Sequence, residues 1–278
     1  MMNDTLSLGR ILRLSVLTIG AIVFLAPYIF MISTAGKAQS DIFSSSLSLI
    51  PQTWFYVENF SKALSRVSMG SLLLNGVVVC GLILIVQVVV AIPCAYAMAK
   101  LSFRVARLMM ALVMLGLLVP IHATALPLYV AFDKMSALNS YFALVAPFSI
   151  SVFAIFLFLQ FFRGIPDDLI HAARLDGMSE TGIVMRVIVP NAWPAITAFS
   201  IFSVVAHWND LFWPLIVVTN QAYATPPLGL LYFRAAEAGD DYGALMAATL
   251  IITLPLVLAF LFAQKRFVEG ITMTGLKG

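Results

Sequence analysis

"HAARLDGMSETGIVMRVIVP", residues 171–190, is a polar stretch in an otherwise strongly apolar chain. Of the 278 residues, 62% are hydrophobic and only 10% are charged. The mean hydropathy of +1.00 lies far outside the range of soluble domains. The composition therefore predicts an all-α integral membrane protein that crosses the bilayer several times, with residues 171–190 outside the hydrocarbon.

Six apolar runs are long enough to span a hydrocarbon core about 30 Å thick, which takes about 20 helical residues. They lie near residues 12–34, 71–97, 106–128, 141–162, 195–218 and 243–264. The first run is longer than the apolar part of a signal peptide, so we expect it to be a retained anchor. The chain, residues 1–278, is then one transmembrane domain of six helices.

Lys and Arg residues predict the orientation, because they favour the cytoplasmic side of the membrane near helix ends. If the N-terminus is inside, the inside segments hold eleven of the 16 basic residues: Arg10, Arg13, Lys100, Arg104, Arg107, Arg163, Arg174, Arg186, Lys265, Arg266 and Lys277. The outside segments hold Lys37, Lys62, Arg66, Lys134 and Arg234. We therefore expect both termini in the cytoplasm. The basic residues mark helix ends and form no basic face, which argues against nucleic-acid binding.

The two cysteines, Cys80 and Cys94, are expected to be packing residues. They lie fourteen residues apart on one predicted helix, which separates them by about 21 Å. That separation is too large for a disulfide, and the sequence suggests no metal site.

The polar segment 163–194 predicts a short helix that ends at a glycine. Pro166 and the carboxylates of Asp167 and Asp168 are typical of a helix start, where the positive end of the helix dipole lies. Gly177 can adopt the left-handed conformation that terminates helices. The first helix is therefore expected near residues 167–175.

A second short helix is predicted after this glycine. Ser179 and Glu180 favour a helix start, and the helix is expected to run to Pro190. From these features alone, the two helices could also rest on lipid headgroups as an amphipathic surface pair.

The spacing of this segment resembles the cytoplasmic signature of permease subunits of ATP-binding cassette importers, which reads E-A-A, three residues, G, nine residues, I-x-L-P. Ala172 and Ala173 match the alanines, Gly177 matches the glycine, and Val187 to Pro190 matches the end. Three stretches and the tail are also similar to the carbohydrate-uptake, maltose-permease-G-like branch: WNDLFWPL (208–215), LNSYFALVAP (138–147), FLQFFRGIPDDL (158–169) and QKRFVEGITMTGLKG (264–278).

The chain departs from the signature at its first position, where His171 replaces the usual Glu. A neutral histidine can hydrogen-bond but cannot form the ion pair of a carboxylate. The charged contact would then lie at Asp167 or Asp168, or else the partner surface differs.

The resemblance implies a type I importer permease fold, with residues 163–194 as a cytoplasmic coupling loop. It further implies a heterodimer with a second homologous permease, a dimer of ATP-binding cassette ATPases, and an extracytoplasmic solute-binding protein, all at the bacterial inner membrane. The expected ATPase-coupling residues are Asp167, Asp168, His171, Ala172, Ala173, Asp176, Gly177 and Pro190. The sequence contains no G-x-x-x-x-G-K-[ST] motif, so ATP and Mg²⁺ are assigned to the ATPase and no cofactor to this chain.

Polar residues within the predicted spans have two interpretations. They can line the translocation pathway and bind solute hydroxyls, or they can hydrogen-bond neighbouring helices together. The candidates are His207, Trp208, Asn209 and Asp210, which lie close together, and the more isolated Asn75, Gln87 and His122. Both interpretations stay open for them, with helix-to-helix bonding favoured for the cluster.

The C-terminal tail, residues 265–278, has two interpretations as well. It can be a frayed end, or, by resemblance, it reaches the ATPases and contributes to coupling.

Three functions remain after these observations: an ATP-driven importer permease, a self-contained secondary transporter, and a membrane scaffold or sensor subunit. The glycine-centred signature favours the first, which would be a non-catalytic subunit. Its solute is expected to be a sugar, with a polyol, glycerol phosphate or a sulfonated sugar as alternatives.

Overall fold

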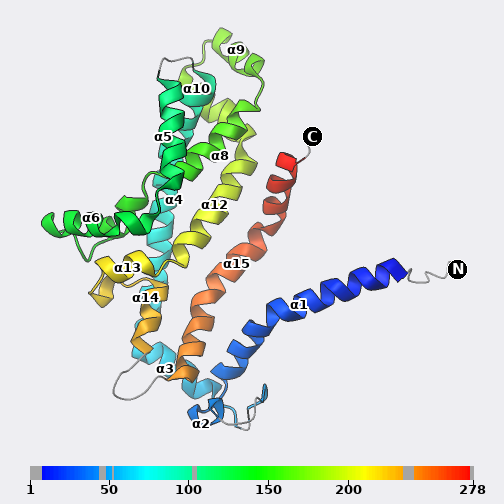
Figure 1. The fold of residues 1–278 in the computed structure, drawn as a ribbon, viewed down its shortest axis with the longest axis vertical. Coiled ribbons are helices and arrows are strands. Elements are labelled where there is room, and N and C mark those ends of the chain that lie inside the picture. Colours follow the sequence, from blue (N-terminus) through cyan, green and yellow to red (C-terminus); the bar gives the residue numbers. More distant parts are fainter. Residues whose placement is uncertain (1–7, 44–47, 52, 102–104, 234–240, 276–278) are drawn as a thin grey trace. The chain divides into compact units, whose positions relative to one another are not determined.

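The computed structural model describes residues 8–43, 48–51, 53–101, 105–233 and 241–275. Among these residues the secondary structure is entirely helical, without a strand (Figure 1). Within these described ranges, three helices are long and apolar enough to cross a membrane, and the number rises to as many as six if each of three bent helix pairs counts as one span. The all-α prediction is therefore confirmed.

Contacts divide the described residues into two compact units. The first draws on Met1–Met69 and Leu230–Thr253, and the second on Gly70–Gly229 and Leu254–Gly278. Helices that begin in the first unit are α1 (Leu8–Ala35), α2 (Gln39–Ile42), α3 (Tyr56–Arg66), α4 (Met69–Lys100), η4 (Leu231–Phe233) and α15 (Tyr242–Gly275).

The second unit holds most of the remaining helices and almost all of α4. Its elements are α5 (Ala106–Leu118), α6 (Ile121–Lys134), α7 (Tyr141–Val145), η1 (Ala146–Phe148), α8 (Val152–Arg163), α9 (Asp167–Leu175), α10 (Glu180–Ile183), η2 (Val184–Ile188), α11 (Val189–Asn191), α12 (Trp193–Trp208), α13 (Phe212–Val217), η3 (Gln221–Tyr223) and α14 (Pro226–Leu230).

The apolar run predicted over residues 106–128 is bent sharply. Its two helices, α5 and α6, meet at an angle of 95°, and Figure 1 shows α6 projecting sideways from α5. The cause is local: Val119 precedes Pro120 and takes an extended conformation with φ −86° and ψ 112°, because the proline ring disfavours the helical region for the residue before it. A straight span is therefore excluded here.

Two further predicted spans are also interrupted. The pair from Tyr141 to Arg163 bends by 43°, and Ser151 restarts the helix by accepting a hydrogen bond from Ala154 N–H at 3.1 Å. In the run 195–218, α12 ends at Trp208 and α13 begins only at Phe212. Each break releases backbone groups that need partners elsewhere.

The last helix is longer than the predicted span 243–264. It continues through the tail as far as Gly275, whereas residues 276–278 lie outside the described part of the chain. Three basic residues that contributed to the orientation, Arg104, Arg234 and Lys277, also lie outside it.

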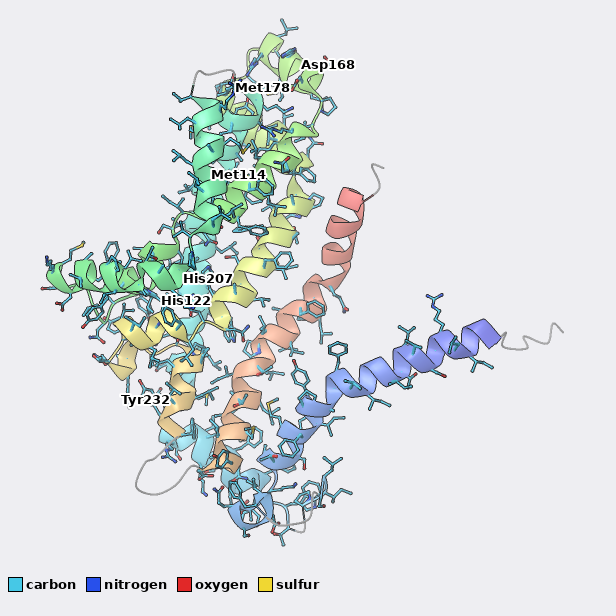
Figure 2. All side chains as sticks on the ribbon, in the orientation of Figure 1. Met114, His122, Asp168, Met178, His207 and Tyr232 are labelled. Atoms are coloured by element: carbon cyan, nitrogen blue, oxygen red, sulfur yellow. The ribbon has the colours of Figure 1, made fainter. Side chains whose placement is uncertain are left out.

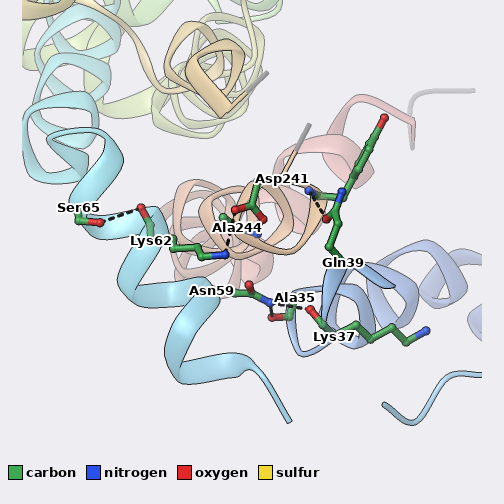
Figure 3. Close-up of polar contacts among 9 residues, drawn as sticks. Ala35, Lys37, Gln39, Asn59, Lys62, Ser65, Asp241 and Ala244 are labelled. Carbon is green, nitrogen blue, oxygen red and sulfur yellow. Dashed lines mark hydrogen bonds and ion pairs between the residues drawn. The ribbon is translucent and has the colours of Figure 1, made fainter. Parts of the chain in front are cut away.

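In the first unit, α3 is joined to its surroundings by a buried amide (Figure 3). Asn59 is 3% exposed, and its Nδ2 donates to the carbonyl oxygens of Ala35 and Lys37, both at 2.9 Å. Gly243, at the start of α15, packs so closely that a Cβ there would lie 2.5 Å from the same nitrogen. Asn59 thus connects the end of α1, α3 and the start of α15.

We expect Asn59→Leu to lower the melting temperature of the purified protein in detergent. The substitution keeps the side-chain size but leaves two carbonyls without their donor, and each unsatisfied buried polar group costs about 1–3 kcal/mol. Gly243→Ala should act in the same direction, because it displaces the amide. Glu58→Gln, one residue away and exposed, is the control. Equal melting temperatures for all three variants would contradict this role of Asn59.

Candidate functional site

The polar loop lies at one end of the second unit and contains α9, whose bounds are those predicted (Figure 1). Pro166 precedes the helix in an extended conformation, and Asp167 and Asp168 occupy the first turn. Ile170 and Ala173 are buried in one core with residues of α4 and α8. The helix therefore has an attached face and a free face.

The free face of α9 carries most of the predicted coupling residues. Asp168, His171 and Ala172 are exposed, as are Asp167 and Asp176. Leu175 is 90% exposed and lies on the same face. Ala173, by contrast, faces the core and is only 5% exposed.

Gly177 ends α9 through a pair of backbone hydrogen bonds. Gly177 N–H donates to Arg174 O at 3.0 Å, and Met178 N–H donates to Ala173 O at 3.0 Å. This is the Schellman arrangement, which requires a left-handed residue after the helix. Gly177 has φ +80°, and nothing lies within 4 Å of a Cβ built there. The glycine is thus required by the backbone conformation and not by lack of space.

The second helix begins as predicted and ends differently. Ser179 accepts a hydrogen bond from Gly182 N–H at 3.2 Å and so caps α10. The chain then passes through the π-helical turn η2 and continues across Pro190 to Asn191. The expected end at Pro190 was wrong. A π turn shifts the hydrogen-bond register, so that Val189 N–H donates to Val184 O, and the chain accommodates a proline that lacks an N–H.

Two ion pairs hold the loop in place. Lys100 Nζ, at the end of α4, lies 2.6 Å from Asp167 Oδ1, and this contact lowers the pKa of the Asp167 carboxyl. Arg174 of α9 pairs with Glu180 of α10, with Nε–Oε1 at 2.8 Å. From the sequence, Lys100 is expected only to mark a helix end, and Tyr96, which donates to Glu180, is expected to have no role. Their spacing of four residues, which places both on one helix face, was the available signal.

Two of the predicted pathway residues, Asn75 and Gln87, are buried and bonded within the protein. Asn75 Nδ2 donates to Ala222 O and Ala224 O, both at 2.9 Å. Gln87 Nε2 donates to Phe148 O at 2.9 Å. Their side-chain oxygens accept from the hydroxyls of Tyr141 and Ser203. This geometry favours helix-to-helix bonding for both residues.

The four clustered candidates, residues 207–210, lie at the break between α12 and α13 and contact different partners. His207 Nε2 lies 3.3 Å from Gln87 Nε2, and Trp208 is buried. Asn209 Nδ2 donates to Val205 O at 2.8 Å, within its own helix. Asp210 Oδ1 accepts from Trp213 N–H at 3.3 Å and so caps α13. These four residues serve different local contacts.

His122 lies in a different setting. It lines an open hollow of about 450 Å³ together with Tyr129 and three apolar residues, and its ring packs against Phe212 with the ring centroids 4.4 Å apart. Figure 2 shows His122 and His207 well separated along the unit from Asp168 and Met178 of the polar loop. A pathway role for His122, which lines this hollow, stays a prediction.

Residues 87–273 match the family model described as the binding-protein-dependent transport system inner membrane component. The chain belongs to this family. It is a multi-pass inner-membrane permease subunit of an ATP-binding cassette importer, and permeases of this family are non-catalytic. Family members work with a second permease, an ATPase and a solute-binding protein.

Individual relatives align over most of the chain. The probable ABC transporter permease protein YurM of Bacillus subtilis is 31% identical, with 91% of this chain and 83% of YurM covered. The arabinooligosaccharides transport system permease protein AraQ of Halalkalibacterium halodurans is 28% identical, with 94% of this chain and 96% of AraQ covered.

A solved structure supports the fold. A chain of a bacterial ABC transporter involved in the import of the acidic polysaccharide alginate superposes with a TM-score of 0.81 at 19% identity. The match covers 96% of this chain and 99% of the other. The predicted importer-permease fold is confirmed.

We expect Gly177→Val to destabilise the loop and Gly177→Asn to leave it nearly unchanged. A β-branched residue in the left-handed region is strained by about 1–2 kcal/mol or more, whereas asparagine is several-fold enriched there. Amide hydrogen exchange of residues 173–183, followed by mass spectrometry, should therefore speed up in Gly177→Val and stay close to the wild-type rate in Gly177→Asn. Equal rates in both variants would contradict the conformational role of Gly177.

Proposed function

We propose that the loop 163–194 is the cytoplasmic surface through which the partner ATPase acts on this permease. The observation that carries the proposal is the free face of α9, where Asp168, His171 and Ala172 surround the 90%-exposed Leu175. Residues 168, 171, 172 and 175 have the spacing of one helix face, and a helix face that the protein leaves exposed can be bound in a groove of a partner. The lipid-headgroup alternative is less well supported, because apolar residues of this helix also face the protein core.

The exposed carboxylates of this face can compensate for His171, which replaces the usual Glu of the signature. The carboxylate of Asp167 is paired with Lys100. Asp168 is exposed and lies three residues, about one helical turn, before His171. We infer that Asp168 supplies the carboxylate that the signature otherwise places at position 171. His171 would then contribute a hydrogen bond and contact area.

We further propose that the transported solute is a sugar or a sugar-like compound. The support is the similarity to the arabinooligosaccharide permease AraQ and the presence of His122 and Tyr129 in the lining of the hollow. His122 and Tyr129 would offer hydrogen bonds to hydroxyls as the solute passes. A second homologous permease would supply the other half of the pathway.

ATP-dependent uptake tests this function. The full complex of this chain with its second permease and ATPases, purified and placed in vesicles with its binding protein, should accumulate a labelled arabino-oligosaccharide, a polyol, glycerol phosphate or a sulfonated sugar when MgATP is supplied. Uptake driven by an ion gradient without MgATP would instead establish a secondary transporter. An ATPase that co-purifies without flux of any of these solutes would favour a scaffold or sensor.

Leu175→Ser should weaken the ATPase contact. Loss of an anchor side chain at the centre of an interface typically costs about 2 kcal/mol or more, which corresponds to a reduction in affinity of about 30-fold. The measurement is the amount of ATPase that co-purifies with the permease across a dilution series. Val57→Ser, at an exposed apolar residue of α3 outside the loop, is the control. Unchanged co-purification in Leu175→Ser would place the ATPase contact elsewhere.

A further inference from the structure

The last turns of α4 carry two polar side chains that reach the loop. Tyr96 and Lys100 lie four residues apart and therefore share one face of the helix. Lys100 Nζ donates to Ile165 O at 2.5 Å and to Asp167 Oδ1 at 2.6 Å. These two acceptors stand at the entry to α9, so Lys100 fixes where that helix begins.

Tyr96 contacts the loop beyond Gly177, at the start of α10. Its hydroxyl donates to Glu180 Oε2 at 2.5 Å, and Arg174 Nε donates to Glu180 Oε1 at 2.8 Å. The carboxylate of Glu180 therefore joins α4 to α10 directly and to α9 through Arg174. Together with Lys100, this chain of contacts attaches α4 on both sides of Gly177.

Burial makes the Lys100 attachment hard to release. The Lys100 side chain is only 4% exposed, whereas Lys62, in the ion pair with Asp241, is 58% exposed. An exposed pair is worth little, but separating a buried charge from its partners leaves an uncompensated charge away from water. The Asp167 side chain is 69% exposed, so this cost falls on Lys100 alone. Because Lys100 would lose both Ile165 O and Asp167 Oδ1 if α9 moved away, we expect α9 and α4 to move together.

Farther along, α4 contacts the places where other helices break. Gln87 donates to Phe148 O, next to the break between η1 and α8. Asn75 donates to Ala222 O and Ala224 O, in the irregular segment that follows α13. The distance from Lys100 to Asn75 along the helix is about 38 Å at 1.5 Å per residue. One helix thus contacts the polar loop at one end and the irregular backbone at the other.

We propose that Tyr96 and Lys100 are positioning residues that fasten α9 to α4, so that a displacement of α9 by the ATPase travels through α4 to the breaks near Phe148 and Ala222–Ala224. The chain itself connects α9 only to α8 and, through α10, η2 and α11, to α12. The side-chain contacts add a third route, to a helix 67 and 84 residues distant in sequence. The inference rests on the proposed docking of the ATPase on α9.

Tyr96→Phe and Lys100→Met test it in the full complex. Each variant removes the polar contact while keeping most of the side-chain volume. The readout is the ratio of solute taken up to ATP hydrolysed in vesicles, with the solute that the wild-type complex accumulates. We expect hydrolysis to continue and the ratio to fall about fivefold or more, the size of a typical coupling between sites.

Three controls accompany these variants. Lys100→Arg keeps the charge and the donors and should retain most of the ratio. Lys62→Met removes an exposed ion pair elsewhere and should leave the ratio unchanged. If Lys100→Met fails to assemble, Tyr96→Phe decides alone, because it removes a single oxygen. The proposal is overturned if the assembled variants keep the wild-type ratio of uptake to hydrolysis. This holds also for a variant in which uptake and hydrolysis both fall by the same factor.

A distance measurement gives a readout that needs no solute. Spin labels at Leu169→Cys on α9 and Ile85→Cys on α4, in a background where Cys80 and Cys94 are alanine, report the separation of the two helices. In the otherwise wild-type complex the distance should be the same without nucleotide and after trapping with MgATP and vanadate. In Tyr96→Phe and Lys100→Met, trapping should change or broaden it. A change of the same size without these substitutions overturns the proposal.

The two proposals fail in different ways. If the proposed function is wrong, the unaltered complex shows no ATP-dependent uptake or retains no ATPase. If only the present inference is wrong, the unaltered complex transports normally, and the Tyr96 and Lys100 variants match it in ratio and in distance.

Discussion

Backbone carbonyls in a membrane cannot be left without donors, and in this protein the amide side chains of α4 supply several of them. An apolar bilayer offers no water to a broken helix, so each break must be satisfied from within the protein. Gln87 serves the break at Phe148, and Asn75 serves the irregular segment at Ala222 and Ala224. Both amides are buried and also accept a hydrogen bond through their oxygen. Two amides of the otherwise apolar α4 thus supply donors to irregular backbone of the second unit.

The polar loop follows the same rule at the membrane surface. Its short helices would gain little stability alone, since isolated helices of this length are marginal in water. They are held by a buried apolar face, by the hydrogen bonds around Gly177 and by the two attachments to α4. What remains outside is a narrow surface around Leu175. These contacts attach the loop to α4 and to the apolar core, while the face of α9 around Leu175 stays exposed.

The sequence predicted those features whose signals are local. The bounds of α9 follow from Pro166, the early carboxylates and Gly177, all within a few residues of the helix ends, and the structure confirms them. The bend at Pro120 also has a local cause but was not predicted, because the span 106–128 was assigned from hydropathy and the apolar run continues through the bend. The attachments of Tyr96 and Lys100 could not be read from the sequence, since their partners lie 84 and 67 residues away. For Asn75 and Gln87, the residue type allowed either a place in the pathway or hydrogen bonds between helices. The carbonyls of Ala222, Ala224 and Phe148 favour hydrogen bonds within the protein.

The burial of Lys100 also has a consequence for how the chain is made. During synthesis Lys100 is made 67 residues before Asp167, and Tyr96 is made 84 residues before Glu180, which at typical translation speeds is an interval of about 3 to 17 seconds. During that interval neither Lys100 nor Tyr96 has the partner found in the folded protein. The end of α4 therefore has to stay hydrated until the loop emerges, and docking of the loop is a late step of folding. Slower translation between these segments would lengthen the time during which an incomplete subunit is open to proteases and chaperones.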